Sequence, residues 1–315
     1  MSRAWSVIFL AGMLVGCAAG GGLSGTGLYR QAQVLEQSSL EAARIGAVAR
    51  AAGLEAQALD LYRRVDATPE MVAALNRLGS LRLSLGELGA AQRDFAQAYE
   101  LSEVCGDGAG QAAAANNLGT SARLGGDLVL AERRFTEAID SPKATAGTRA
   151  TGLNNRALLY FAAGDNKAAR RDLLEALSED RSGRDSAGEA LRLRNLATID
   201  LQEETWDRAI DQLAAAYLLD VEREDSAAIA RDLELLGAAR WSKASSGDNG
   251  DNGEEGENRR ERRQALSERR RSYEIDRLQG AVKDAERQRN AIETWCAQWP
   301  AAPRPVDCAF LPEAP

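Results

Sequence analysis

Histidine is absent from this chain of 315 residues. Because imidazole is the commonest general base and a common metal ligand, its absence excludes Ser–His and Cys–His nucleophile pairs and histidine metal sites. Of the four cysteines, Cys105, Cys296 and Cys308 lack the Cys-x-x-Cys spacing typical of zinc sites. No glycine-rich phosphate loop follows a predicted strand. We therefore expect no enzyme, no metal and no cofactor.

An excess of basic residues is also lacking. The chain has 39 Lys and Arg against 47 Asp and Glu, a net charge of −8. Because nucleic-acid binding needs basic patches, we expect no nucleic-acid partner. Aromatic residues make up only 5%. Such a composition suits helices that cross closely through small residues.

One pattern of small and large apolar residues occurs five times. It is Gly, then Ala five residues later, an aromatic residue or Leu after four more, and a small residue after three more. Its copies start at Gly53, Gly86, Gly126, Gly164 and Glu204, and Gly46, Gly79, Gly119, Ala157 and Ala197 precede them by seven residues. Each copy predicts two helices joined by a turn at the Gly. Since one pair cannot bury its apolar face alone, the copies must stack.

The pattern resembles the tetratricopeptide repeat, through Leu78-Gly79, Leu118-Gly119, Ala91-x-x-x-Phe95 and Ala131-x-x-x-Phe135. The family's early Trp is absent, and most copies are longer than the family's repeat. We expect the added residues in turns such as 105–110 and 141–147. The resemblance implies an all-α solenoid of five to six helix pairs over residues 38–244, with a groove for a protein or peptide partner. A stack of unrelated helical hairpins is the alternative.

Asparagine recurs on the first helices of the copies. The candidate groove residues are Asn76, Asn116, Asn117, Asn154, Asn155 and Asn195, with Arg194 at a place where earlier copies have Asn. The Asn side chain can bond both the N–H and the C=O of a bound strand. The series resembles part of the carboxylate clamp of chaperone-binding repeats, without the clamp's lysines. Hydrogen bonding within the stack is the alternative.

Residues 1–16 resemble a bacterial lipoprotein signal peptide. Arg3 precedes an apolar run from Trp5 to Val15, which is too short to span a bilayer. The run ends at Leu14-Val15-Gly16-Cys17, which resembles a lipobox. The resemblance implies acyl chains, palmitate among them, on Cys17 and a place on the periplasmic face of the outer membrane. We expect residues 17–37 to be a flexible tether. An ordinary secretory signal is the alternative.

The last third of the chain departs from the repeat. Residues 245–258 contain no apolar residue and are predicted to be an acidic, disordered loop rather than a calcium loop. Residues 259–299 are predicted to form one long Arg-rich amphipathic helix, which either caps the stack or docks a partner or lipid headgroups. The Pro-rich tail, 300–315, excludes further helix. Cys296 and Cys308 are expected to form a disulfide in an oxidising periplasm.

These features predict a lipid-anchored scaffold that binds a protein partner and assists assembly of an envelope complex, of the pilus or secretion-channel type. Three alternatives remain open. The scaffold could instead organise peptidoglycan enzymes, or the chain could be a passive spacer. An envelope enzyme with its chemistry in the C-terminal helix and tail is a further alternative, which the lack of histidine disfavours.

Overall fold

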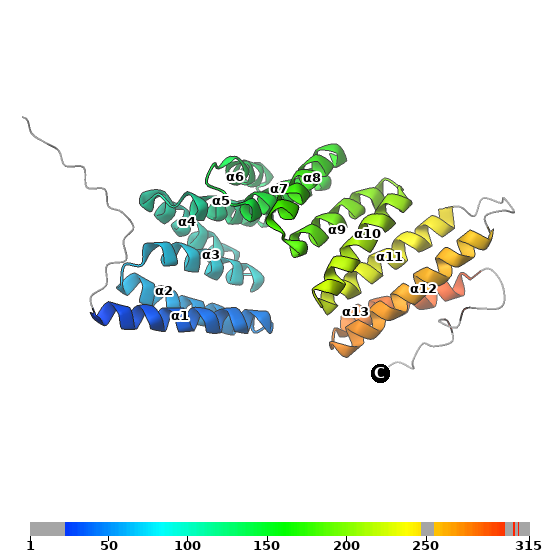
Figure 1. The fold of residues 1–315 in the computed structure, drawn as a ribbon, viewed down its shortest axis with the longest axis horizontal. Coiled ribbons are helices and arrows are strands. Elements are labelled where there is room, and N and C mark those ends of the chain that lie inside the picture. Colours follow the sequence, from blue (N-terminus) through cyan, green and yellow to red (C-terminus); the bar gives the residue numbers. More distant parts are fainter. Residues whose placement is uncertain (1–22, 247–254, 300–304, 306–307, 309–315) are drawn as a thin grey trace, which may run out of the picture. The chain divides into compact units, whose positions relative to one another are not determined.

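The computed structural model describes residues 23–246 and 255–299, together with residues 305 and 308. Within these residues it has thirteen α-helices and no strand (Figure 1). The predicted all-α class, a stack of five to six helix pairs, is confirmed. The chain divides after Thr148 into two compact units, residues 1–148 and 149–315, which are considered separately below.

From α1 to α12, odd-numbered helices are the first helices of the pairs, and even-numbered helices are the second. In the first unit they are α1 (Leu23–Arg44), α2 (Val48–Arg64), α3 (Thr68–Ser84), α4 (Leu88–Cys105), α5 (Gly108–Leu124) and α6 (Leu128–Asp140). Next come α7 (Ala146–Ala162, which starts just before the division), α8 (Asn166–Gly183), α9 (Ser186–Gln202), α10 (Trp206–Glu222), α11 (Ser226–Ser246), α12 (Glu255–Leu278) and α13 (Val282–Ala297). α13 follows the sixth pair, α11–α12.

Tight turns recur every 20 residues in the first unit. The residues with left-handed φ there are Gly46, Asp66, Gly86, Gly106 and Gly126. The second unit has the same spacing at Gly164, Arg184, Glu204 and Glu224. Glycine adopts a positive φ at little cost, whereas Glu204 adopts φ 56° against its steric preference. Turns within and between pairs are therefore alike, and a pair repeats after 40 residues.

The sequence-based register of the first copy is wrong. Gly53 lies inside α2, and Gly46 is the turn residue, with φ 77°. The first copy therefore runs Gly46, Ala51, Glu55 and Ala58, with Ser39 in the position that Gly79 holds in the second. The helical pattern alone could not distinguish the register at Gly53 from the register at Gly46, because Ala and Gly are so frequent that both fit.

The location expected for the added residues is also wrong at 105–110. Helix α4 ends at Cys105 and α5 begins at Gly108, so only a short turn separates them. Relative to a tetratricopeptide repeat of about 34 residues, the extra length lies mainly in the helices, which mostly have 17 or 18 residues. Residues 141–145, between α6 and α7, do form a longer connection.

The second and third pairs each pack a glycine of the first helix against a phenylalanine of the second, Gly79 against Phe95 and Gly119 against Phe135. Phe95 and Phe135 are fully buried. A Cβ on Gly119 would lie 2.6 Å from Cδ1 of Phe135, so only glycine fits there. Ala157 and Leu173 occupy the corresponding positions of the fourth pair, within one apolar cluster. A smaller partner on the second helix thus leaves room for a methyl group on the first.

The predicted tether is wrong from residue 23 onward. Helix α1 begins at Leu23, so residues 23–37 are helical and the first pair starts earlier than residue 38. Ala32 is fully buried, and Leu28, Tyr29 and Leu35 pack against the same core. Apolar residues at these spacings place α1 against α2, which outweighs the helix-weakening glycines near its start. Residues 1–22, with Cys17, lie outside the described residues.

The prediction of one continuous helix over 259–299 is wrong. Helix α12 ends at Leu278 and α13 begins at Val282, with Gly280 at φ 74° between them. Leu278 and Val282 are 81% and 60% exposed, so they are not part of a buried stripe. α12 packs against α11 as the second helix of the sixth pair, and α13 packs against α12.

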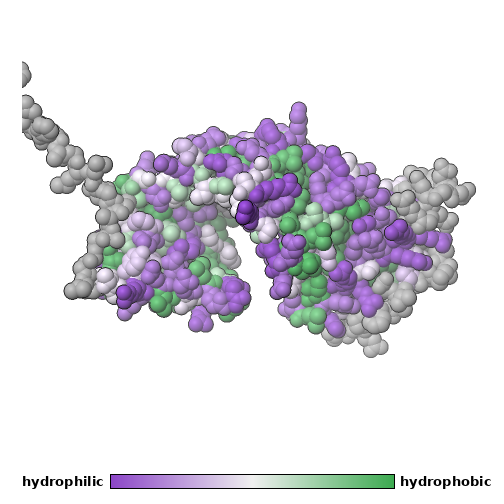
Figure 2. All heavy atoms as spheres, in the orientation of Figure 1, coloured by the Kyte–Doolittle hydropathy of each residue, from purple (hydrophilic) through white to green (hydrophobic). Residues whose placement is uncertain are grey.

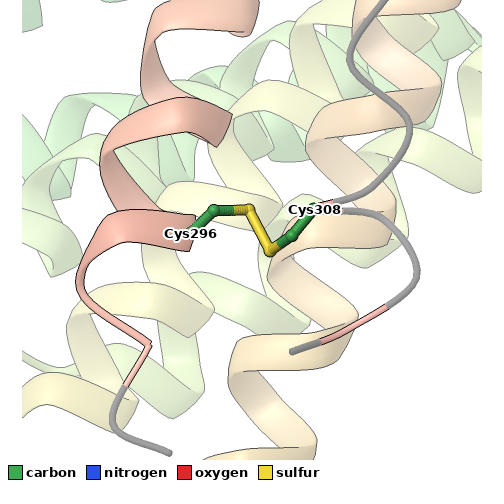
Figure 3. Close-up of a disulfide and its surroundings, with 2 residues drawn as sticks. All are labelled: Cys296 and Cys308. Carbon is green, nitrogen blue, oxygen red and sulfur yellow. A yellow bond between two sulfur atoms is a disulfide. The ribbon is translucent and has the colours of Figure 1, made fainter. Parts of the chain in front are cut away.

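The predicted acidic loop is shorter than 245–258. Residues 245–246 end α11, residues 255–258 begin α12, and residues 247–254 lie outside the described part of the chain. Apart from Pro305 and Cys308, so does the tail over 300–315. The sulfur atoms of Cys296 and Cys308 lie 2.09 Å apart, in a bond that joins the last turn of α13 to residue 308 (Figure 3).

Several arginines of α12 make contacts within the second unit. Trp241 and Trp295 stack with ring centroids 4.7 Å apart. Arg262 lies over the Trp241 ring at 5.6 Å, and Arg269 lies over the Trp295 ring at 4.9 Å. Arg271 donates a hydrogen bond to the Tyr217 hydroxyl at 2.8 Å. These three cations hold α12 against its neighbours, which supports the capping interpretation of this segment.

The surface in view in Figure 2 is mainly hydrophilic, with smaller hydrophobic patches among the polar side chains. Among the described residues, no helix combines the length and the apolar character that crossing a membrane requires.

Candidate partner-binding site

Two of the predicted asparagines of the first unit lie side by side. The Nδ2 group of Asn117 on α5 donates to Oδ1 of Asn76 on α3 at 2.9 Å. Asn76 in turn donates from Nδ2 to the Val72 carbonyl at 3.2 Å. Asn116 is buried, with 5% exposure. The pair Asn76–Asn117 therefore links two successive first helices and is only part-buried.

The second unit repeats this arrangement 78 residues later. Nδ2 of Asn195 on α9 donates to Oδ1 of Asn154 on α7 at 2.6 Å. Asn155 beside it is half-buried. Each unit thus has an asparagine pair that joins neighbouring first helices, and the two pairs belong to separate units.

Arg194 lies inside the second unit, only 7% exposed. Its Nη2 is 2.6 Å from Oδ2 of Asp220, and its Nε is 2.8 Å from Oδ1 of Asp232. Both carboxylates are fully buried. Burial, together with the nearby Asp220 carboxylate, raises the pKa of Asp232 to about 7. A ligand carboxylate could reach Arg194 only by displacing these two partners.

A pocket of ≈ 290 Å³ adjoins the asparagine pair of the first unit. All but one of its lining residues come from the first helices α1, α3 and α5. They are Ser39, Leu40, Ala43, Glu55, Asn76, Arg77, Ser80, Leu81 and Asn117, of which Glu55 belongs to α2. We call this the first-unit pocket. It combines apolar walls with the asparagine pair and an ion-pair cluster.

That cluster is centred on Arg77. Its Nε donates to Oε1 of Glu55 at 2.9 Å, and its Nη2 lies 3.0 Å from Oε1 of Glu36. The Tyr62 hydroxyl donates to the other oxygen of Glu36 at 2.6 Å. Glu55 is fully buried, and its Oε2 has no hydrogen-bond partner among the described residues. Burial raises the pKa of Glu55, and the Arg77 guanidinium opposes the shift.

Sequence reasoning missed Ser39, Glu55 and Arg77. With the register at Gly46, Glu55 falls in the position of Phe95 and Phe135, where an apolar side chain is the rule. A charge at a core position of a repeat would have indicated this site. The wrong register concealed it by assigning Tyr62 to that position.

Among the described residues, no cluster of His, Cys, Asp and Glu side chains has a geometry that could hold a metal ion. The first-unit pocket therefore offers hydrogen-bonding groups, one ion-pair cluster and apolar walls. Such a lining suits the binding of a polypeptide segment.

The tetratricopeptide repeat family model matches residues 70–144, which include α4, α5, α6 and most of α3. No curated protein sequence matches the chain. Among solved structures, BtubC (BKLC) from P. vanneervenii is similar over 89% of this chain and 96% of its own, with 18% identity and a TM-score of 0.54.

Two further structures have similar folds. A Rap protein, solved in complex with Competence and Sporulation Factor, matches 88% of this chain and 77% of its own, with 12% identity and a TM-score of 0.60. A signal-transduction ATPase with a tetratricopeptide repeat sensor, PH0952 from Pyrococcus horikoshii, matches 87% of this chain and 44% of its own. Its identity is 12% and its TM-score 0.56. At these identities the likeness is one of fold.

Proposed function

We propose that this chain, a tetratricopeptide-repeat-like helical solenoid, is a lipid-anchored scaffold that binds a protein partner on the first helices of its repeats. The anchor would be at Cys17 on the periplasmic face of the bacterial outer membrane, and the partner would belong to an envelope complex of the pilus or secretion-channel type. The function is binding rather than catalysis.

The first-unit pocket carries the proposal of partner binding. It lies where α1, α3 and α5 meet, and it places Asn76 and Asn117 beside the apolar side chains of Leu40 and Leu81. Amide groups can pair with the backbone of an extended segment, while an adjacent pocket takes one of its side chains. The Rap protein structure, which contains a bound factor, is consistent with a partner-binding role for this kind of fold.

Two features support the proposed compartment, one in the sequence and one in the structure. The apolar run before Cys17 resembles a lipoprotein signal. The bond between Cys296 and Cys308 is of a kind that persists in oxidising compartments such as the periplasm. Several acyl chains on one residue would give firm membrane attachment, whereas a single chain gives marginal attachment.

Photo-crosslinking in living cells tests the binding surface. Ser80 lines the first-unit pocket and is exposed, so a photoreactive residue there should capture one dominant protein. Arg133, exposed on α6, is the matched control outside the pocket. Equal capture at both positions, or none at Ser80, contradicts the proposal. Asn117→Ala with Asn155→Ala should weaken capture while circular dichroism shows unchanged helicity.

The lipid anchor needs its own test. Cys17→Ser should move the protein from the membrane fraction to the soluble periplasmic fraction and abolish labelling by radioactive palmitate. Persistent labelling in the variant would place the lipid elsewhere or exclude this anchor.

A second candidate is a scaffold that organises peptidoglycan enzymes, which has the same architecture and the same anchor. The identity of the protein crosslinked at Ser80 separates the two candidates. A structural component of a pilus or secretion channel supports the first, and a peptidoglycan enzyme supports the second.

A further inference from the structure

We propose that the first-unit pocket receives a lysine side chain of the bound partner, with the ammonium group directed to the Glu55 carboxylate and the alkyl stem against Leu40, Ala43 and Leu81. The inference rests on the proposed partner binding and specifies its chemistry.

The charge of the cluster at the pocket is negative. Arg77 is a single cation shared between two carboxylates, those of Glu36 and Glu55. Next to them, Glu70 accepts a hydrogen bond from the Tyr29 hydroxyl at 2.6 Å and adds a third carboxylate. Because Arg77 is already shared between two carboxylates, an anionic ligand would meet a net negative field. A cation would be attracted.

The donors that line the pocket are engaged in contacts within the unit. The hydroxyl of Ser39 donates to the Ala51 carbonyl at 2.9 Å, and that of Ser80 donates to the Asn76 carbonyl at 2.9 Å. Asn117 donates to Asn76, as described above. A hydroxyl or carboxamide that donates in this way still has an oxygen that can accept. Apart from Arg77, whose Nε and Nη2 face Glu55 and Glu36, the pocket therefore presents mainly acceptors, which complement the three N–H donors of an ammonium group.

Glu55 provides the second, independent indication. Its Oε2 is buried and accepts no well-formed hydrogen bond among the described residues. Burial raises the pKa of Glu55 and the nearby Ser39 hydroxyl opposes that shift, but this hydroxyl donates to the Ala51 carbonyl. A buried carboxylate with an unfilled acceptor costs free energy. The repeat pattern does not call for a carboxylate there, because Phe95, Phe135 and Leu173 occupy the equivalent position in other pairs. Departures from a repeat pattern that weaken packing are expected at functional sites, and an ammonium donor would supply the missing partner.

The shape of the pocket agrees with a single long side chain. Its ≈ 290 Å³ are bordered by Leu40 and Ala43 of α1 on one side and Leu81 of α3 on the other. Leu40 is 45% exposed, so part of its apolar surface is uncovered. A lysine stem covers such surface while its charged end reaches polar groups.

Nuclear magnetic resonance with a lysine side-chain analogue tests the proposal. The full chain, with labelled Leu and Ala methyl groups, is titrated at low salt with n-butylammonium and, in parallel, with the neutral 1-butanol. We expect saturable shifts at Leu40, Ala43 and Leu81 with butylammonium, and at least tenfold weaker binding of butanol. Equal binding of the two, or no saturable shift with butylammonium, overturns the proposal.

Two variants control for charge and folding. Glu55→Gln keeps the shape and should weaken butylammonium binding at least tenfold, whereas Glu175→Gln, an exposed change of the same charge, should not. Unchanged affinity in Glu55→Gln also overturns the proposal. If Glu55→Gln proves unstable, Glu55→Leu, which restores the repeat pattern, makes the same test. Capture from Ser80 without butylammonium binding would leave the proposed scaffold standing and reject the lysine pocket.

Discussion

Gly79 is expected to be intolerant of a single added methyl group. All three atoms nearest to a Cβ at Gly79 belong to the Phe95 ring, and its Cδ1 would be only 2.7 Å away. The ring is fully buried and cannot move into solvent. Overpacking of this kind costs about 1–3 kcal/mol, while replacing Gly by Ala inside a helix contributes about 1 kcal/mol in the opposite direction. Gly79→Ala should therefore lower the free energy of unfolding by about 0–2 kcal/mol, with a central value of about 1 kcal/mol.

The fourth and fifth pairs indicate how to relieve the clash. There, Ala157 and Ala197 take the place of Gly79, and Leu173 and Leu213 take the place of Phe95. Phe95→Leu alone should cost about 1 kcal/mol, as a conservative core change does. The double variant Gly79→Ala, Phe95→Leu loses the clash and keeps the helix gain. Its free energy of unfolding should lie within about 0.5 kcal/mol of that of the parent. This corresponds to a coupling energy of about 2 kcal/mol between the two sites.

Urea unfolding followed by circular dichroism measures all four proteins of this cycle. If the two single effects add within about 0.5 kcal/mol, the contact between Gly79 and the ring is not the reason for the glycine. Gly86→Ala is a useful comparison, because nothing lies within 4 Å of its Cβ position and any loss there comes from its φ of 78°.

Three other predictions concern the rest of the chain. Cys308→Ser opens a disulfide with a sequence separation of 12 and should lower the free energy of unfolding by about 3 kcal/mol. Faster hydrogen exchange in α13 would report this loss, and free thiols at both positions in the unreduced parent would refute the disulfide. The pKa of Asp232, raised by burial from 3.8 to about 7, means that the folded state binds an extra proton between these values. Stability should therefore fall as the pH rises from 4 to 7. The Asp232→Asn variant, whose amide is still able to donate to Asp220, should flatten the dependence of the melting temperature on pH across that range. An unchanged slope of melting temperature against pH would contradict this. Glu55→Leu should leave stability unchanged or raise it by about 1 kcal/mol, because Leu213 fills the equivalent position; a loss above about 2 kcal/mol would show that Glu55 is structural.

The candidate site was predictable only in part. Asn76 and Asn117 are repeated polar residues on first helices, and that regularity is visible in the chain itself. Their mutual hydrogen bond, the burial of Asn116 and the internal ion pairs of Arg194 depend on side-chain positions that spacing does not define. The same holds for Glu55, which entered the site only when the register of the first pair was known.

The amino-acid sequence by itself determined the class of fold. Regular spacing of small and large apolar residues, with helix-ending residues between, permits little other than stacked helical pairs, because each pair must bury its face against the next. The tertiary structure decided the register of the first pair, the break at Gly280 and the start of the first pair at Leu23. These depend on which of several compatible faces is buried, a choice set by contacts between residues distant in the chain. The same contacts brought Glu55, Arg77 and the asparagine pair together in one pocket.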